Sequence, residues 1–163
     1  MKGSLKPYLL YVGNDYPHKN LKRLKSAFDK LIEHGLDYEL VLAGTDSFVN
    51  DEELDKLYRN AELFIFPSLS EGFGLPPLEA MTRGVAVACS DIPCLVEILG
   101  NAAIYFNPLD VDDIAEKIKK VLFDKDLRDV LIKRGYEQTK KYNWQKMTQE
   151  TLAIYASILQ TSR

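Results

Sequence analysis

Apolar residues occur along this chain in two alternating patterns, short continuous runs and longer segments with helical spacing. Runs of mostly apolar residues are typical of buried strands and occur at residues 8–12, 39–43, 63–66, 85–89 and 103–106. Apolar positions spaced by three and four predict helices at residues 21–32, 51–61, 77–83, 93–99, 111–123, 126–140 and 144–160. Nearly continuous apolar strands separated by helices indicate a parallel sheet that is covered on both faces. We therefore predict an α/β fold, a three-layer sandwich.

Local signals mark the ends of the first two predicted helices. Asn20 precedes the helix at 21–32 as its predicted N-cap, and Gly35 lies just past its end. Asn50 is the predicted N-cap of the next helix, which opens with acidic residues where the helix dipole favours negative charge. Only residues 45–50 separate the second strand from that helix, and this connection is too short for a helical crossover.

Composition places the chain among globular proteins. Its 163 residues are 46% apolar and 28% charged, which suffices for a hydrophobic core, and we assign residues 1–163 to a single domain. A net charge of −3 argues against a nucleic-acid partner. The sequence has no apolar run of about 18 residues and no secretion signal, so we expect a cytoplasmic protein without a transmembrane segment. Cys89 and Cys94 lack metal-ligand spacing, and we interpret them as reduced thiols that serve packing.

The connection after the third strand carries the main candidate chemistry. A glycine-rich loop with Gly72 and Gly74 joins that strand to the following helix. Such a loop exposes backbone N–H groups beside a positive helix end, which suits a phosphate, whereas Glu71 and Glu79 can accept hydrogen bonds from hydroxyls. Ligands of such sheets bind at the carboxyl ends of the strands, where the loop after the first strand brings Lys19 opposite the glycines. Phosphate and hydroxyl recognition together indicate a nucleotide sugar.

Each of these residues also has a simpler, structural interpretation. The glycines can serve a turn, a glutamate in a first helical turn complements the helix dipole, and Lys19 can be a solvated lysine, like the neighbouring His18 and Asp15. The combination favours a site. With Pro77 as the first helical residue, Glu79 lies near the third position, and its side chain can reach back over the loop.

The segment from Ser70 to Met81 resembles the signature of retaining glycosyltransferases of family 4 (group 1), in which seven residues separate two glutamates. Further segments match sequence motifs that are usual in this family, and they occur in the same order, namely Tyr11-Val12-Gly13, Pro17-His18-Lys19-Asn20, Leu42-Ala43-Gly44, Leu57-Tyr58-Arg59-Asn60-Ala61, Phe66-Pro67-Ser68 and Tyr142-Asn143-Trp144. The resemblance covers nearly the whole chain. It is to the C-terminal, donor-binding domain of the GT-B fold, in which two Rossmann-like domains face a cleft.

This resemblance implies a role for each matching residue. Lys19 contacts the donor diphosphate and Glu71 contacts the transferred sugar, and these are the implied catalytic residues. Glu79 holds the ribose hydroxyls. The other implied donor-binding residues are Gly13, Gly72, Phe73, Gly74 and Leu75, the last four through their backbone N–H groups. Transfer with retention then needs neither a metal nor a cofactor, because the lysine and the helix end meet the phosphate charge.

The chain departs from the pattern of the family in two places. Asn14 stands where many members carry an arginine, although some members use the residue before the lysine, which is His18 here. A helix and most of a strand are missing between Gly44 and Asp51. The missing strand is the outer edge of the order 3-2-1-4-5-6, so the resemblance implies a five-stranded sheet of order 2-1-3-4-5, truncated Rossmann-like and flavodoxin-like. The loop that usually lines the nucleotide base is lost with that strand.

The resemblance includes no N-terminal domain, which supplies the acceptor site in this family. The chain is then the donor-binding half of a retaining glycosyltransferase, as a fragment, an engineered piece or a natural half with a partner. Alone, we expect it to be inactive and able to self-associate through exposed apolar residues. The nucleotide (UDP, GDP or ADP), the sugar and the acceptor stay open.

Other classes of protein fit less well or differ in what they bind. A receiver domain needs an acidic residue where Pro67-Ser68 ends the third strand, and a dinucleotide-binding domain needs a Gly-x-Gly-x-x-Gly motif after the first strand. Neither feature is present. The alternative that we keep is a noncatalytic or engineered scaffold that has the same fold and binds no nucleotide.

Overall fold

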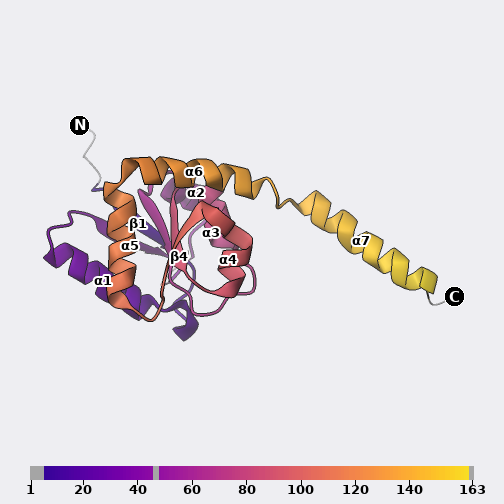
Figure 1. Ribbon diagram of the computed structural model, residues 1–163, viewed down its shortest axis with the longest axis horizontal. Coiled ribbons are helices and arrows are strands. Elements are labelled where there is room, and N and C mark those ends of the chain that lie inside the picture. The colour runs from indigo at the N-terminus through magenta and orange to yellow at the C-terminus, as the bar shows by residue number, and fades with distance from the viewer. Residues whose placement is uncertain (1–5, 46–47, 162–163) are drawn as a thin grey trace.

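Five parallel strands form the centre of the protein (Figure 1). The computed structural model describes residues 6–45 and 48–161. The strands lie in the order β2-β1-β3-β4-β5, which confirms the predicted α/β fold and its strand order. Their bounds are Tyr8–Val12 for β1, Glu39–Ala43 for β2, Leu63–Phe66 for β3, Val87–Ser90 for β4 and Ala103–Phe106 for β5.

Helices cover both faces of this sheet (Figure 1). Their bounds are Leu21–Glu33 for α1, Asp51–Asn60 for α2, Leu75–Thr82 for α3, Pro93–Leu99 for α4, Val111–Phe123 for α5 and Lys125–Thr139 for α6. α1 and α5 pack against each other on one face, and α2, α3 and α4 lie on the other. α6 packs on both α5 and α3, and its Arg128 forms an ion pair with Glu62, the residue before β3. α6 therefore crosses the amino ends of the strands and leaves their carboxyl ends open.

The central strands supply most of the core. Every residue of β3 and β4 is buried, as expected for apolar strands with helices on both faces. β2 is one of the two edge strands, and its first four residues are partly or fully exposed. Between β2 and α2, residues 44, 45 and 48–50 form no strand, whereas residues 46 and 47 of this connection lie outside the described residues. An outer strand beyond β2 is thus dispensable for the core.

The start of α3 differs from the sequence prediction. This helix begins at Leu75 and not at Pro77, so Pro76 and Pro77 occupy its second and third positions. Proline is tolerated throughout the first turn of a helix, because N–H groups there have no acceptor within the helix. Glu79 is consequently the fifth helical residue, two positions further along than the sequence predicted.

Other boundaries are confirmed or shifted slightly. Asn50 caps α2 as predicted, because its Oδ1 atom accepts a hydrogen bond from the Glu53 N–H at 2.9 Å. The strand predicted at 85–89 begins only at Val87, since the Val85 N–H donates to the carbonyl of Ala80 at the end of α3 (3.1 Å). The sequence prediction missed two short 3-10 helices, η1 (Pro17–Lys19) and η2 (Gly100–Ala102).

The last helix, α7 (Trp144–Thr161), extends away from the layered body (Figure 1). Its exposed apolar side chains are Met147, Leu152, Ile154, Tyr155, Ile158 and Leu159. No helix within the described ranges is both long enough and apolar enough to cross a membrane. Whether residues 1–163 act as a single domain stays a prediction.

Candidate functional site

The loops at the carboxyl ends of β1, β2 and β3 are tied to one another by backbone hydrogen bonds. The Leu69 N–H, after β3, donates to the carbonyl of His18 at 2.7 Å. The Gly13 N–H, after β1, donates to the carbonyl of Ala43 at the end of β2, at 2.9 Å. Gly13 has a φ of 146°, which favours glycine, and its N–H is already used within the protein. These bonds fix the position of η1 beside the glycine-rich loop.

Lys19 and Glu71 meet at this edge of the sheet. Lys19 is the last residue of η1, and its Nζ atom lies 2.6 Å from Oε1 of Glu71. Only 14% of the lysine side chain and 13% of the glutamate side chain are exposed. The same ammonium lies 5.3 Å from the centroid of the Phe66 ring, a favourable distance for a cation–π contact. Both residues that the sequence predicts as catalytic are therefore in contact, and each neutralises the other.

The glycine-rich loop presents free backbone donors. Within the described part of the chain, none of the N–H groups of Gly72, Phe73, Gly74 and Leu75 donates a hydrogen bond. Gly74 is the N-cap of α3 in a left-handed conformation, with a φ of 92°. Since the second and third residues of α3 are prolines, the first turn of this helix offers few N–H groups of its own. Any anion here would therefore bind the four loop amides more than the helix end.

Glu79 lies apart from this pair and contacts α2. Its Oε2 atom accepts a hydrogen bond from the hydroxyl of Tyr58 at 3.0 Å. Burial, and then the nearby Glu79 carboxylate, raise the pKa of the Tyr58 phenol well above its usual value. Tyr58 is therefore a permanent donor at any ordinary pH. The sequence analysis matched the segment around Tyr58 to a family but missed its role, because the two residues are 21 positions apart.

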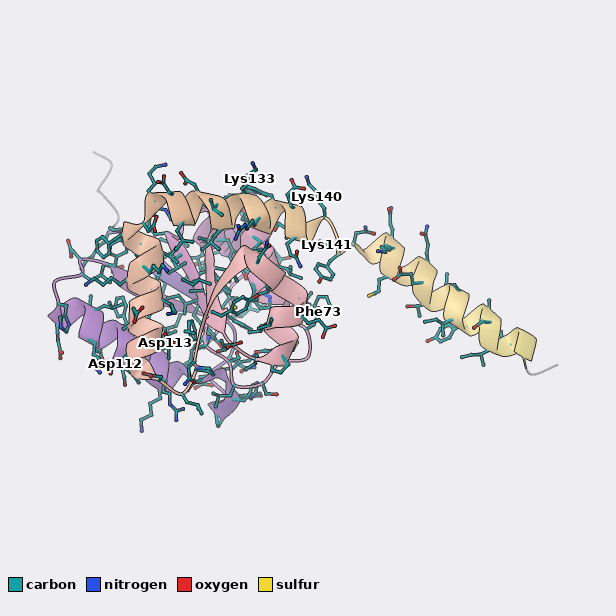
Figure 2. The ribbon with its side chains drawn as sticks, in the orientation of Figure 1. Phe73, Asp112, Asp113, Lys133, Lys140 and Lys141 are labelled. Atoms are coloured by element: carbon teal, nitrogen blue, oxygen red, sulfur yellow. The ribbon has the colours of Figure 1, made fainter. Side chains whose placement is uncertain are left out.

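A groove of about 470 Å³ opens next to Glu79, between the start of α3 and the start of α7. Phe73, Leu75 and Glu79 line one side, and Tyr142 and Met147 belong to the other. Phe73 packs edge-on against the Tyr142 ring, with the ring centroids 5.6 Å apart. Figure 2 shows Phe73 at the edge of the body that is nearest to α7. Lys19 and Glu71 do not line this groove, so the candidate residues form two neighbouring clusters joined by the glycine-rich loop.

Asn20 has a role that differs from the predicted one. It occupies the N-cap position of α1, but its side chain does not cap the helix. Its Nδ2 atom donates instead to the carbonyls of Pro67 (3.1 Å) and Pro108 (2.7 Å), and the residue is 5% exposed. Asn20 also has a left-handed backbone, with a φ of 59°, which is uncommon outside glycine. Asn20, which directly follows Lys19, is thereby tied to the loops after β3 and β5.

The two residues that depart from the family pattern serve the loop itself. The carbonyl of Asn14 accepts a hydrogen bond from the Tyr11 hydroxyl at 2.7 Å, and its side chain accepts one from the Tyr16 N–H at 3.3 Å. The side chain of His18 is exposed. Within residues 6–45 and 48–161, no group of three or more His, Cys, Asp and Glu residues is arranged to hold a metal ion.

Comparison with known proteins decides the family. A model described as glycosyl transferases group 1 matches residues 47–138, more than half of the chain, including the glycine-rich loop and both glutamates. The chain belongs to the group 1 glycosyltransferases. This confirms the resemblance at the level of group 1.

Curated relatives of this group 1 glycosyltransferase domain are longer proteins. O-antigen chain mannosyltransferase B of Escherichia coli is 36% identical over 172 residues, covering 91% of this chain and 45% of that protein. Sulfoquinovosyl transferase SQD2 of Arabidopsis thaliana is 32% identical, covering 88% of this chain and 32% of that protein. The chain thus spans less than half the length of these relatives. The 172 aligned residues exceed what 91% of a 163-residue chain supplies, so the relative carries residues that this chain lacks within the matched stretch.

Solved structures share the fold of the domain. A trehalose-phosphate synthase (UDP-forming) from Burkholderia vietnamiensis matches with a TM-score of 0.83 and 13% identity, over 93% of this chain and 45% of that one. Sucrose-phosphate synthase from Thermosynechococcus elongatus matches with a TM-score of 0.77 and 22% identity, over 96% and 46%. At such low identity these matches establish the Rossmann-like arrangement of the GT-B glycosyltransferases and leave the substrate open.

Proposed function

We propose that this chain is the donor-binding half of a retaining family 4 glycosyltransferase and that it binds a nucleotide-diphosphate sugar at the carboxyl ends of β1 and β3. One observation carries the proposal. Lys19 and Glu71, 52 residues apart in sequence, meet at 2.6 Å beside a loop with four backbone N–H groups that donate to no acceptor among the described residues. A cation and several free N–H donors suit a diphosphate, and a carboxylate next to them suits a sugar hydroxyl.

The proposed reaction breaks the bond between the anomeric carbon of the sugar and the diphosphate oxygen, and it forms a bond from that carbon to the oxygen of an acceptor hydroxyl, whose proton passes to the departing diphosphate. Negative charge then grows on the diphosphate, where the Lys19 ammonium and the amides of residues 72–75 stabilise it. Glu71 contacts the transferred sugar and holds it in place. Because this chemistry depends on positioning and on charge stabilisation, a short set of residues suffices. In the free protein the Lys19–Glu71 ion pair occupies the site, so the diphosphate has to compete with a carboxylate for Lys19.

A second domain completes the proposed enzyme. The chain spans 45% of O-antigen chain mannosyltransferase B, and α7 exposes apolar side chains outside the layered body. We infer that a further domain, in the same polypeptide or in a partner, supplies the acceptor site and contacts α7. Without it, the bound donor faces water on one side, so the isolated chain transfers sugar negligibly. The exposed apolar side chains also favour self-association.

A direct comparison of donors can identify the sugar and the nucleotide that the chain binds. Several relatives are named as mannosyltransferases, among them O-antigen chain mannosyltransferase B and serotype-specific mannosyltransferase WbdA, so a mannosyl donor is the first to test. The loop that lines the base in other members is missing here. We therefore propose that affinity depends more on the diphosphate than on the base.

The test is thermal unfolding of the chain with GDP-mannose, UDP-glucose, ADP-glucose or pyrophosphate. A ligand that is added at about 100 times its dissociation constant for the folded chain stabilises the chain by about 2.7 kcal/mol. We expect all four to raise the melting temperature. If none of the four ligands raises the melting temperature at millimolar concentration, the alternative holds, and the chain is a scaffold of the same fold that binds no nucleotide.

Glu79→Ala separates the ribose contact from the diphosphate contact. We expect this variant to bind nucleotide sugars about tenfold more weakly, the size of one lost hydrogen bond to a charged group, and to bind pyrophosphate as the parent does. Calorimetric titration measures both affinities. Glu33→Ala, at an exposed glutamate of α1, is the matched control and should change neither. An equal loss for pyrophosphate would contradict the ribose role of Glu79.

A further inference from the structure

Tyr58 is the one fully buried side chain of α2, and its hydroxyl lies at the boundary with α3. That hydroxyl lies 3.0 Å from Oε2 of Glu79 and 3.5 Å from the carbonyl oxygen of Pro76. The shorter contact, to a charged acceptor, is the stronger of the two. The phenol therefore donates to Glu79.

The ring of Tyr58 is held from two directions, so its hydroxyl has a fixed position. Phe64 of β3 contacts it with a centroid distance of 5.6 Å. The guanidinium of Arg83 lies 5.0 Å from the ring centroid. Arg83 is itself bound to Asp55 at 2.8 Å and donates to the carbonyl of Glu79 at 3.1 Å. Tyr58 is thus part of a rigid contact between α2 and α3.

Glu79 depends on this contact for its orientation. The residue is exposed, and within the described part of the chain its carboxylate accepts a hydrogen bond from Tyr58 only. An exposed glutamate without this bond samples several rotamers, and a ligand has to order it on binding. With Oε2 bound to Tyr58, Oε1 stays available to accept hydrogen bonds, on the side of α3 that lines the groove with Phe73 and Leu75.

We propose that Tyr58 is a positioning residue, whose hydroxyl holds the Glu79 carboxylate ready to accept hydrogen bonds from the ribose of a nucleotide donor. This inference rests on the proposed function, because Glu79 needs this orientation only if it binds a donor. Tyr58 does not touch the ligand. Its contribution is the preorganisation of a residue that does.

Tyr58→Phe tests the inference because it removes the hydroxyl and keeps the ring between Phe64 and Arg83. We expect affinity for the best nucleotide sugar to fall about tenfold and affinity for pyrophosphate, which has no ribose, to stay unchanged. In the Glu79→Ala background the same change should have no further effect on nucleotide-sugar affinity. Calorimetric titration of both ligands into all four proteins measures this cycle, and thermal unfolding confirms that each is folded.

Tyr8→Phe is the matched control. Tyr8 also donates to α2, to the carbonyl of Leu57 at 2.8 Å, but it does not contact Glu79. We expect it to leave both affinities unchanged. Suppose that Glu79→Ala lowers the affinity for nucleotide sugars alone. The inference is then overturned if Tyr58→Phe leaves the affinity for nucleotide sugars unchanged, or if it lowers the affinities for nucleotide sugars and for pyrophosphate equally. If the parent binds no nucleotide sugar, or if Glu79→Ala changes nothing, the proposed function itself fails and the inference fails with it.

Discussion

Lys19→Ala is expected to weaken pyrophosphate and nucleotide sugars alike, by between about tenfold and about hundredfold. The change removes a charge-assisted hydrogen bond, worth about 1.5–3 kcal/mol, from the diphosphate that both ligands share. It also leaves the Glu71 carboxylate, only 13% exposed, without its partner and next to the incoming phosphates. Calorimetric titration of both ligands measures the effect. Lys22→Ala, at an exposed lysine three residues further along, is the control and should bind both ligands as the parent does.

Glu71→Gln should separate the two ligands. The free Lys19 ammonium then no longer has a carboxylate partner, so we expect pyrophosphate to bind more tightly than it does to the parent. Nucleotide sugars lose the proposed contact between Glu71 and the sugar. Their affinity should therefore rise less than that of pyrophosphate, or fall below that for the parent. Weaker pyrophosphate binding by Glu71→Gln, or unchanged binding by Lys19→Ala, would show that the phosphate does not lie at this ion pair.

Gly74→Ala is expected to destabilise the fold by about 1–3 kcal/mol and to abolish anion binding at the loop. Gly74 has a φ of 92°, where an alanine is strained, and a Cβ atom there would lie 2.6 Å from Cδ2 of the fully buried Leu95. Either the loop or Leu95 has to move, and a movement of the loop displaces the N–H groups of residues 72–75. Urea unfolding measures the loss of stability, and pyrophosphate titration measures the loss of binding.

Gly72→Ala is the matched control within the same loop. A Cβ atom at Gly72 meets nothing within 4 Å, and its backbone is not in the left-handed region. We expect its stability to stay within about 0.5 kcal/mol of the parent. Equal destabilisation by both variants would mean that the loop geometry described here is wrong.

Much of the fold was predictable because each strand is a short apolar run bounded by a turn. The fully buried strands β3 and β4 have no alternation of polar and apolar residues, which is typical of a parallel sheet with helices on both faces. The short connection after Gly44 excluded a crossover, which is again a local feature. The strand order itself, which the structure confirms, was implied by the resemblance to the family and not by local features.

Parts of the site depended on tertiary contacts and could not be predicted in this way. Asn20 has the residue type of an N-cap, but two buried carbonyls from other loops bind its side chain instead. From the sequence alone, Tyr58 is interpreted as one more apolar position of α2. Only the packing of α2 on α3 brings its hydroxyl to Glu79. The start of α3 was displaced because prolines fit any position of a first turn. Local preferences therefore located the loops but not the partners of individual side chains.

The most direct test of the account is the response of backbone amides to a donor. We would titrate an isotope-labelled chain with the nucleotide sugar that stabilises it best and follow the amide resonances by NMR. The largest changes should occur at Gly72, Phe73, Gly74 and Leu75, whose N–H groups have no hydrogen-bond acceptor within residues 6–45 and 48–161, with further changes around Lys19. Amides near Asp124, at the junction of α5 and α6, should not respond. Changes centred on Asp124, with residues 72–75 unaffected, would contradict the proposed donor site.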